Sequence, residues 1–256
     1  MFFETHSHYN FKHFDKDREA LLSTTLPAAG IDYLVNIGID MPSSYYNAEL
    51  AKRHDYIYAA IGFHPHDTHL MKDEDIQSLE DLSKTSKVVA IGEIGLDFYR
   101  DTSPRDVQTR RFKEQLDLAH RVSLPVIIHS RSADDEVYEM LAISGIGKAQ
   151  GGIMHCFCGD LPLAEKYVAM GFVIGIGGVV TYKNAQGLQE AVRALPLDSI
   201  VLETDCPYLS PEPVRNKRND SRNLAYIAAK VAELKGLDIN EVAKATTANA
   251  KRIFRI

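Results

Sequence analysis

The chain has 256 residues, of which 45% are hydrophobic and 25% charged, and its formal net charge is −6. This is the composition of a soluble globular protein with a large core, and the negative charge gives no general attraction to nucleic acid. No apolar run approaches the roughly 18 residues of a membrane-spanning helix, and the first residues lack the pattern of a signal peptide. Three cysteines are a sparse, odd set that suits a reducing compartment. We expect a cytoplasmic protein without a membrane association.

Short apolar runs rich in β-branched residues recur along the chain. They predict eight strands, at Met1–Thr5, Tyr33–Ile39, Ile57–Phe63, Val88–Ile94, Pro125–Ile128, Gly152–Met154, Phe172–Ile176 and Ile200–Glu203. Apolar periodicity and end signals predict helices between and after them, among others at Asp15–Ala29, Arg105–Val122, Asn223–Leu234 and Asn240–Ala245.

Alternating strands and helices with no Pro/Gly/Ser-rich linker indicate a single α/β domain over residues 1–256. The length is usual for one (β/α)8 TIM barrel, which needs roughly 250 residues. A doubly wound open sheet is the structural alternative. Candidate ligands at the ends of several separate strands favour the closed barrel.

Six side chains of metal-binding types stand at or just after the ends of these strands: His6, His8, Glu93, His129, His155 and Asp205. The carboxyl ends of barrel strands converge on one face, where barrel enzymes keep their chemistry. The two histidines of His-x-His point to the same side of their strand, because side-chain direction repeats every two residues. Each oxygen of Glu93 can bind one ion, so this carboxylate can bridge two. The pattern predicts a centre for two divalent metal cations, and hence a metal-dependent hydrolase.

Other polar residues near these strand ends receive weaker predictions. A carboxylate such as Glu203, inside an apolar strand, needs cations or hydrogen-bond donors around it. We expect His64 at the mouth of the barrel, in contact with substrate or leaving group, and His66 in a loop. The remaining histidines show no partner pattern and are expected on the solvated surface: His13, His54, His69 and His120.

Six motifs in chain order carry a resemblance: E-T-H-S-H at 4–8, G-F-H-P-H at 62–66, I-G-E-I-G-L-D at 91–97, I-I-H-S-R at 127–131, G-G-I-M-H-C-F at 151–157 and L-E-T-D-C-P-Y-L-S-P at 202–211. Together they resemble the TatD family of metal-dependent deoxyribonucleases, which belongs to the amidohydrolase-like barrel superfamily. The segment R-N-K-R-N at 215–219 and the terminal T-T-A-N-A-K-R-I-F also fit this family.

The resemblance implies the distribution of the ligands. His6, His8 and Asp205 would hold one metal, His129 and His155 the other, and Glu93 would bridge them. It also implies that Glu203 and His64 line the substrate site. The chain departs from the family in having Glu4 where Asp is usual. It also has cysteines, Cys156, Cys158 and Cys206, where small or hydroxyl residues are more common. These thiols could add soft coordination or oxidation sensitivity, but we favour small packed side chains.

For the chemistry, we expect Asp205 to bind metal and accept a proton from the attacking water, with Glu203 as the second candidate for the proton. The metals are expected to be Mg, Mn or Zn. Candidate phosphate contacts are the cations Arg131, Arg215, Lys217 and Arg218, and Tyr208 or Tyr99 could stack on a base. A charge run on its own is usually a solvated face, but this one follows the last strand, where barrels often bind phosphate.

Three functions remain open at this point. The first is a metal-dependent nuclease that removes nucleotides from single-stranded DNA ends, 3′ to 5′ as the resemblance implies, with RNA left open. The second is a two-metal hydrolase of amides, lactones or aminoacyl esters. The fourth strand has Glu93 where such enzymes can carry a carbamylated lysine, which favours the nuclease. The third is an inactive metal-binding protein, against which the complete ligand set argues. No obligate protein partner is expected.

Overall fold

The computed structural model describes all residues, 1–256, as one parallel eight-stranded sheet with the strands in sequential order. The strands are β1 (Phe2–Ser7), β2 (Ile31–Ile37), β3 (Ile57–Ile61), β4 (Val88–Asp97), β5 (Val126–Arg131), β6 (Gly152–Met154), β7 (Phe172–Ile176) and β8 (Ile200–Leu202). β1 and β8 meet through a parallel bridge between Ser7 and Cys206. The amide of Asp205 also donates to the carbonyl of His6 over 3.0 Å. The barrel predicted from the sequence is therefore confirmed.

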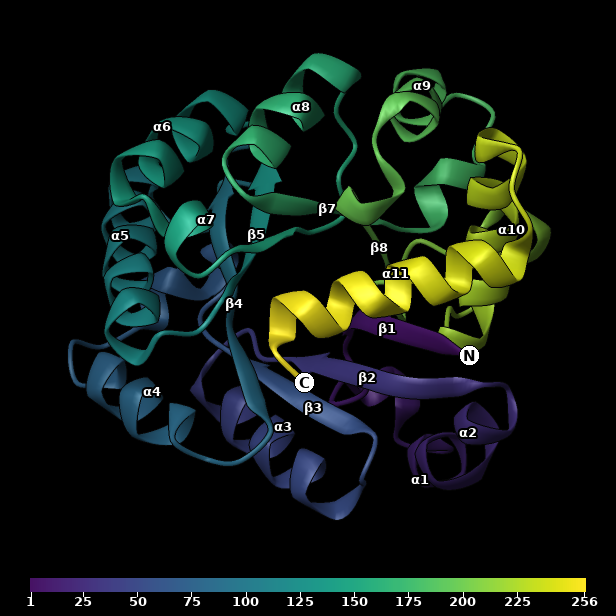
Figure 1. The fold of residues 1–256 in the computed structure, drawn as a ribbon. Helices are drawn as coiled ribbons and strands as arrows, with labels where there is room; N and C mark the ends of the chain where they lie inside the picture. Colours follow the sequence, from purple (N-terminus) through teal and green to yellow (C-terminus); the bar gives the residue numbers. More distant parts are fainter.

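Helices cover the outer face of the sheet (Figure 1). The longer ones are α3 (Met41–Arg53), α4 (Asp75–Ser83), α5 (Arg105–Val122), α6 (Asp134–Ser144), α8 (Leu161–Ala169), α9 (Gln186–Ala194), α10 (Leu224–Lys235) and α11 (Ile239–Phe254). Between α10 and α11, Gly236 has φ +66° and the Asp238 carboxylate caps the next helix. One helix therefore ends at a glycine in the left-handed region, and the next begins at an acidic cap two residues later.

The apolar residues divide between two cores, one outside and one inside the barrel. The outer core packs the helices against outward-facing strand residues such as Leu34. The inner core contains Val35, Ile37 and their neighbours, together with Ile253 and Phe254 from α11. α11 lies across one end of the barrel (Figure 1) and closes the end at which the strands begin. The other end is left to polar side chains.

Several predicted boundaries are wrong, and in two places the reason is visible. The helix expected over Asp15–Ala29 is broken into α1 (Arg18–Ala20), a π-helical turn η2 (Leu21–Thr25) and α2 (Leu26–Ala28). Pro27 has no N–H to continue the hydrogen-bond ladder, which explains the irregular turn. The last helix was expected over Asn240–Ala245, but it runs on to Phe254 because its apolar face covers the inner core.

β4 extends past the predicted Ile94 to Asp97, because its pairing with β5 continues from Gly95 to Asp97. Gly95 has φ +146°, and a Cβ on it would lie 1.9 Å from the carbonyl oxygen of His129. Only glycine fits where β4 and β5 approach so closely. β6 and β7 have the predicted bounds, and the other strand ends agree with the prediction or differ from it by at most three residues.

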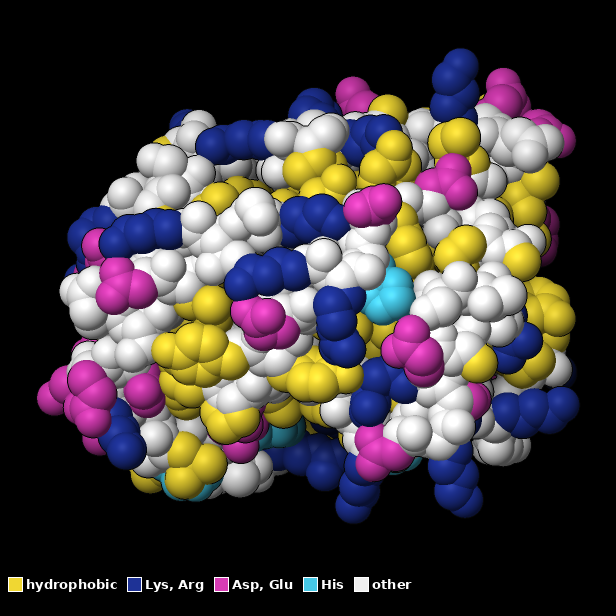
Figure 2. Space-filling view, turned by 90° about the horizontal axis from the view of Figure 1, so that it is seen from below, with side chains coloured by type: hydrophobic (Ala, Val, Ile, Leu, Met, Phe, Trp, Pro, Cys, Tyr) yellow, Lys and Arg dark blue, Asp and Glu magenta, His cyan; other side chains and the backbone are white.

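The face of the molecule seen in Figure 2 has no large patch of side chains of one charge. On the face seen in Figure 2, Lys and Arg side chains are interspersed with Asp and Glu. None of the helices has the length and apolar character that crossing a membrane requires. Attraction of a polyanion must therefore depend on local cations near the site.

Candidate metal centre

The six predicted ligands come together at the carboxyl ends of the strands. His6 lies on β1 and His8 directly follows it, whereas Glu93 lies on β4 and His129 on β5. His155 directly follows the end of β6, and Asp205 is the third residue after the end of β8. All four imidazoles and both carboxylates are buried or nearly so. Because water cannot solvate buried charges, these side chains must be stabilised by one another or by a cation between them.

The two oxygens of the Glu93 carboxylate face different imidazoles. Oε2 lies 3.3 Å from Nε2 of His6 and 3.9 Å from Nε2 of His8. Oε1 lies 2.9 Å from Nδ1 of His129 and 3.7 Å from Nε2 of His155. Oε2 therefore lies beside the pair His6 and His8, and Oε1 beside the pair His129 and His155. This is the arrangement required of a ligand that bridges two cations.

Asp205 completes the group around His6 and His8. Its Oδ1 lies 3.4 Å from Nε2 of His8 and 3.9 Å from Nε2 of both His6 and His155. Asp205 has φ +55°, in the left-handed region. Its backbone is fixed by β1, whose His6 carbonyl accepts its amide. Closure of the barrel between β1 and β8 therefore places this carboxylate over the histidine pair.

The donor chemistry of the site fits metal cations. Nε2 of His6 and Nε2 of His8 lie 3.2 Å apart, and the Nδ1 atoms of both rings are buried without a hydrogen-bond partner. Two imidazole nitrogens at about 2.0–2.1 Å from one tetrahedral zinc ion would be separated by about 3.3 Å. Sets of ligand atoms within 4.8 Å of one another include His6–His8–Glu93 and His64–Glu93–His129. A cation between these atoms would satisfy lone pairs that otherwise face each other.

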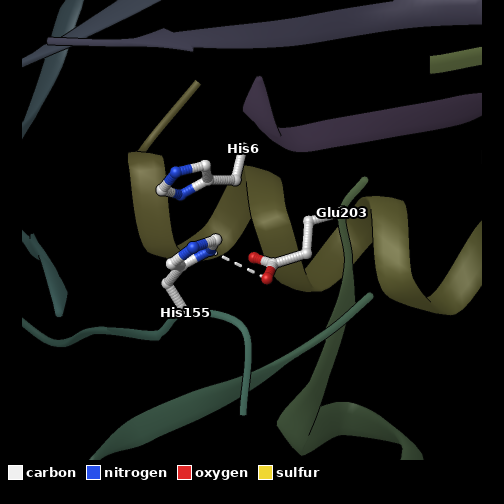
Figure 3. A group of neighbouring side chains, drawn as sticks. All are labelled: His6, His155 and Glu203. Carbon is white, nitrogen blue, oxygen red and sulfur yellow. Dashed lines mark ion pairs between the residues drawn. The ribbon is translucent and has the colours of Figure 1, made fainter. Parts of the chain in front are cut away.

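A carboxylate stands behind each of two histidines. Oε1 of the buried Glu203 lies 2.8 Å from Nδ1 of His155, with the His6 ring stacked above at a centroid distance of 3.4 Å (Figure 3). Oδ2 of Asp97 lies 3.2 Å from Nε2 of His129 and 2.7 Å from Nε2 of His66. Carboxylates in this position fix the orientation and tautomer of metal-binding imidazoles.

The electrostatics of the metal-free site follow from these contacts. Burial alone would raise the pKa of Glu93, but His64, His155 and His6 hold it well below its usual value. Burial would lower the pKa of His155, yet Glu203 and Glu93 raise it to about 10. Without a metal, His155 therefore holds a proton at neutral pH, whereas burial lowers the pKa of His6 and favours its neutral form. A cation has to replace that proton, as metal ligands must be deprotonated.

Sequence reasoning missed two buried carboxylates, Asp97 and Glu4. Asp97 shares a strand with Glu93, and the side-chain period of two places 93, 95 and 97 on one face, which was the available signal. Glu4 accepts the amide of His6 over 3.2 Å and the amide of Thr204 over 2.8 Å. It also accepts the hydroxyl of Thr204 over 2.6 Å, and so ties β1 to β8 beside the site.

The other histidines separate into two kinds. His64 lies beside the centre, with Nε2 3.5 Å from Oε1 of Glu93, as expected for a residue at the mouth. His66 is in a loop turn as predicted, but its contact with Asp97 connects it to the site. Of the histidines expected on the surface, His13 and His69 are exposed. His54 and His120 are half-buried, and the His120 ring contacts the carbonyl of Ser144.

The candidate substrate residues all lie around the mouth. The guanidinium of Arg131 stacks on Tyr99 at 4.1 Å, and Tyr208 is exposed. Lys217 is exposed and has no ion-pair partner, whereas Arg218 forms a two-pronged pair with Asp17 at 2.8 and 2.6 Å. The third cation of the loop, Arg215, contacts Glu212 over 2.8 Å and stacks on Tyr182 at 3.9 Å. The three cysteines form no disulfide, and Cys206 is buried.

Known proteins are similar to this chain over its whole length. The sequence model of the family described as TatD related DNase matches residues 3–255. The chain belongs to the TatD family. It is 44% identical to the uncharacterized metal-dependent hydrolase YabD of Bacillus subtilis over 100% of both chains. It is 35% identical to the 3'-5' ssDNA/RNA exonuclease TatD of Erwinia tasmaniensis over 95% of each.

Among solved structures, the TatD homologue YjjV of Escherichia coli superposes with a TM-score of 0.94 at 33% identity, covering 100% of this chain and 98% of that one. The sequence-based assignment to the TatD family is thus confirmed. The chain is a metal-dependent hydrolase of the TatD family, with clusters of His, Glu and Asp that suit metal binding.

Proposed function

We propose that this TatD family member hydrolyses phosphodiester bonds with two bound divalent cations and acts as a 3′ to 5′ exonuclease on single-stranded DNA ends. The observation that carries the proposal is the Glu93 carboxylate, whose two oxygens face separate groups of imidazoles. The name of the Erwinia tasmaniensis relative, a 3'-5' ssDNA/RNA exonuclease, supports the substrate class and the polarity. RNA is then a second substrate.

We divide the proposed metal ligands between two cations. His6, His8 and Asp205 would hold one cation, His129 and His155 the other, and Glu93 both. Such a pair of cations, of Mg, Mn or Zn, lowers the pKa of a bound water and stabilises the attacking and leaving oxygens. Asp205 is the proposed proton acceptor, because its side chain is 17% exposed whereas that of Glu93 is 4% exposed.

We also propose roles for Glu203 and His64, based on their positions in the site. Glu203 lies behind His155 and is fully buried, which supports a role in orienting that imidazole. Direct proton transfer by Glu203 is the competing role. The side chain of His64 is 12% exposed at the mouth and lies next to Glu93, so we assign it to contact the substrate phosphate or leaving group.

Free cations at the mouth support a phosphate-bearing substrate. Arg131 and Lys217 have no acidic partner and can pair with phosphate oxygens directly. Arg215 and Arg218 are paired with acids, so each would have to exchange a carboxylate for a phosphate. Tyr208 offers an exposed ring for a base. So few contacts on an acidic chain imply weak binding without sequence preference. With three unpaired thiols, we place the protein in the reducing cytoplasm.

The test is digestion of 3′- and 5′-labelled single strands by metal-free protein reconstituted with Mg, Mn or Zn, beside a panel of amides, lactones and esters. The proposal predicts loss of the 3′ label first and no activity in Glu93→Ala. Glu165→Ala, which removes an exposed carboxylate from α8, is the matched control and should be fully active. Turnover of the small substrates without digestion of either strand would refute the nuclease proposal.

A further inference from the structure

A cavity of about 520 Å³ adjoins the metal centre on the side of β1, β2 and β8. It lies between the loops that follow these three strands, and its volume is typical of small-molecule sites. The residues that line it include three with aromatic rings, Phe11, Tyr46 and Tyr208. The predicted ligands do not line it, so it is a separate compartment of the barrel mouth.

Two contacts connect the cavity to the centre. The ring of Phe11 stacks on the ring of His8 at a centroid distance of 4.7 Å and an interplanar angle of 7°. The amide of Tyr208 donates to the carbonyl of Asp205 over 3.0 Å. The cavity therefore begins one aromatic ring away from the proposed metal ligands. A group attached to a phosphate at the centre can reach it.

The polar lining restricts what the cavity can bind. The carboxylate of Asp40 accepts the amide of Ser43 as the cap of α3, which fixes its position. Lys12, on the same wall, has no ion-pair partner. Aromatic faces together with one free cation suit a flat, aromatic group that carries a phosphate.

We propose that this cavity binds the nucleobase next to the scissile phosphate, with Tyr46 and Tyr208 against its faces and Lys12 near a flanking phosphate. The inference rests on the proposed nuclease function and names the part of the substrate that the site recognises. Every base has a π-face, so binding by stacking is tolerant of sequence. The cavity would therefore select nucleotides over phosphates without a base.

Binding is tested by titrating the protein with deoxyadenosine monophosphate and with 2-deoxyribose 5-phosphate, which lacks the base. The nucleotide should bind more tightly, and Tyr46→Ala and Tyr208→Ala should each weaken it by roughly 5- to 150-fold, the measured range for base stacking. Tyr45→Ala is the matched control, since Tyr45 is on the same helix but is exposed outside the cavity. Neither Tyr variant should affect binding of the sugar phosphate.

Digestion of strands that carry one abasic residue gives the second readout. An abasic residue at one position near the 3′ end should raise KM for wild type at least as much as the Tyr46→Ala substitution does, because it removes the contacts with both tyrosines. On the abasic strand, Tyr46→Ala should raise KM little further. Equal binding of nucleotide and sugar phosphate, or an equal loss in Tyr45→Ala, would overturn the proposal. A cavity that binds the nucleotide in a protein that cuts no strand would leave the inference standing and refute the nuclease function instead.

Discussion

Oε1 of Glu203 lies 2.8 Å from Nδ1 of His155, and both residues are buried. The carboxylate is in ion-pair contact with one ring nitrogen, while Nε2 of the ring lies 3.7 Å from Glu93 and 3.9 Å from Asp205. Because a carboxylate in this position fixes the tautomer of the imidazole, the metal site depends on a residue that need not touch the metal.

Glu203→Gln is therefore expected to weaken metal binding by roughly 10- to 100-fold, the usual effect of losing such a partner. Activity should return when the metal concentration is raised. Two measurements test this. Competition with a chromophoric chelator gives the metal affinity, and kinetics at saturating metal give kcat. A variant that binds metal normally and has no kcat would show that Glu203 transfers the proton itself.

Glu93→Ala is expected to abolish activity while the protein remains folded. The substitution removes the ligand whose two oxygens face the two histidine groups, and metal assistance accounts for several kcal/mol of transition-state stabilisation. Metal content by mass spectrometry should fall, while the circular dichroism spectrum should remain that of the wild type. Normal turnover with a full metal complement would contradict the bridging role.

The cations in the loop after β8, Arg215, Lys217 and Arg218, are expected to have different roles. Lys217→Ala should reduce the slope of log affinity against log salt by roughly 0.7 for single-stranded DNA, as expected for one lost phosphate contact. Arg218→Ala should instead cost about 0.2–1 kcal/mol of unfolding free energy, because Arg218 pairs with Asp17 at the surface. An unchanged salt slope in the triple variant of Arg215, Lys217 and Arg218 would show that the loop is merely solvated.

The cysteines should differ sharply in reactivity. Burial raises the pKa of the Cys206 thiol, whereas a hydrogen bond with Cys156 lowers the pKa of Cys158, which is exposed. A disulfide reagent should therefore label Cys158 first in the native protein and Cys206 only after denaturation. Peptide mapping identifies the labelled residue, and Cys158→Ser should remove the fast phase. Rapid labelling of Cys206 would mean that the junction between β1 and β8 opens readily.

The sequence contained enough to predict the barrel and where its candidate ligands meet, because both depend on local patterns. Each strand is a short apolar run, and each ligand except Glu93, which lies within β4, stands near the carboxyl end of a strand or shortly after it. What escaped prediction depends on contacts between distant segments. Asp97 acquires its role from His129 and His66 on other elements, and Arg218 is neutralised by Asp17 far earlier in the chain. The irregular turn at Leu21–Thr25 needed the combined effect of Pro27 and packing, which periodicity alone does not show.

The central claim is that Glu93 bridges two cations, and a crystal structure of the metal-loaded protein with anomalous diffraction tests it most directly. The account predicts two anomalous peaks, one beside each oxygen of Glu93, with His6 and His8 at one and His129 and His155 at the other. A single peak would contradict it, and so would two peaks that are not both in contact with the Glu93 carboxylate.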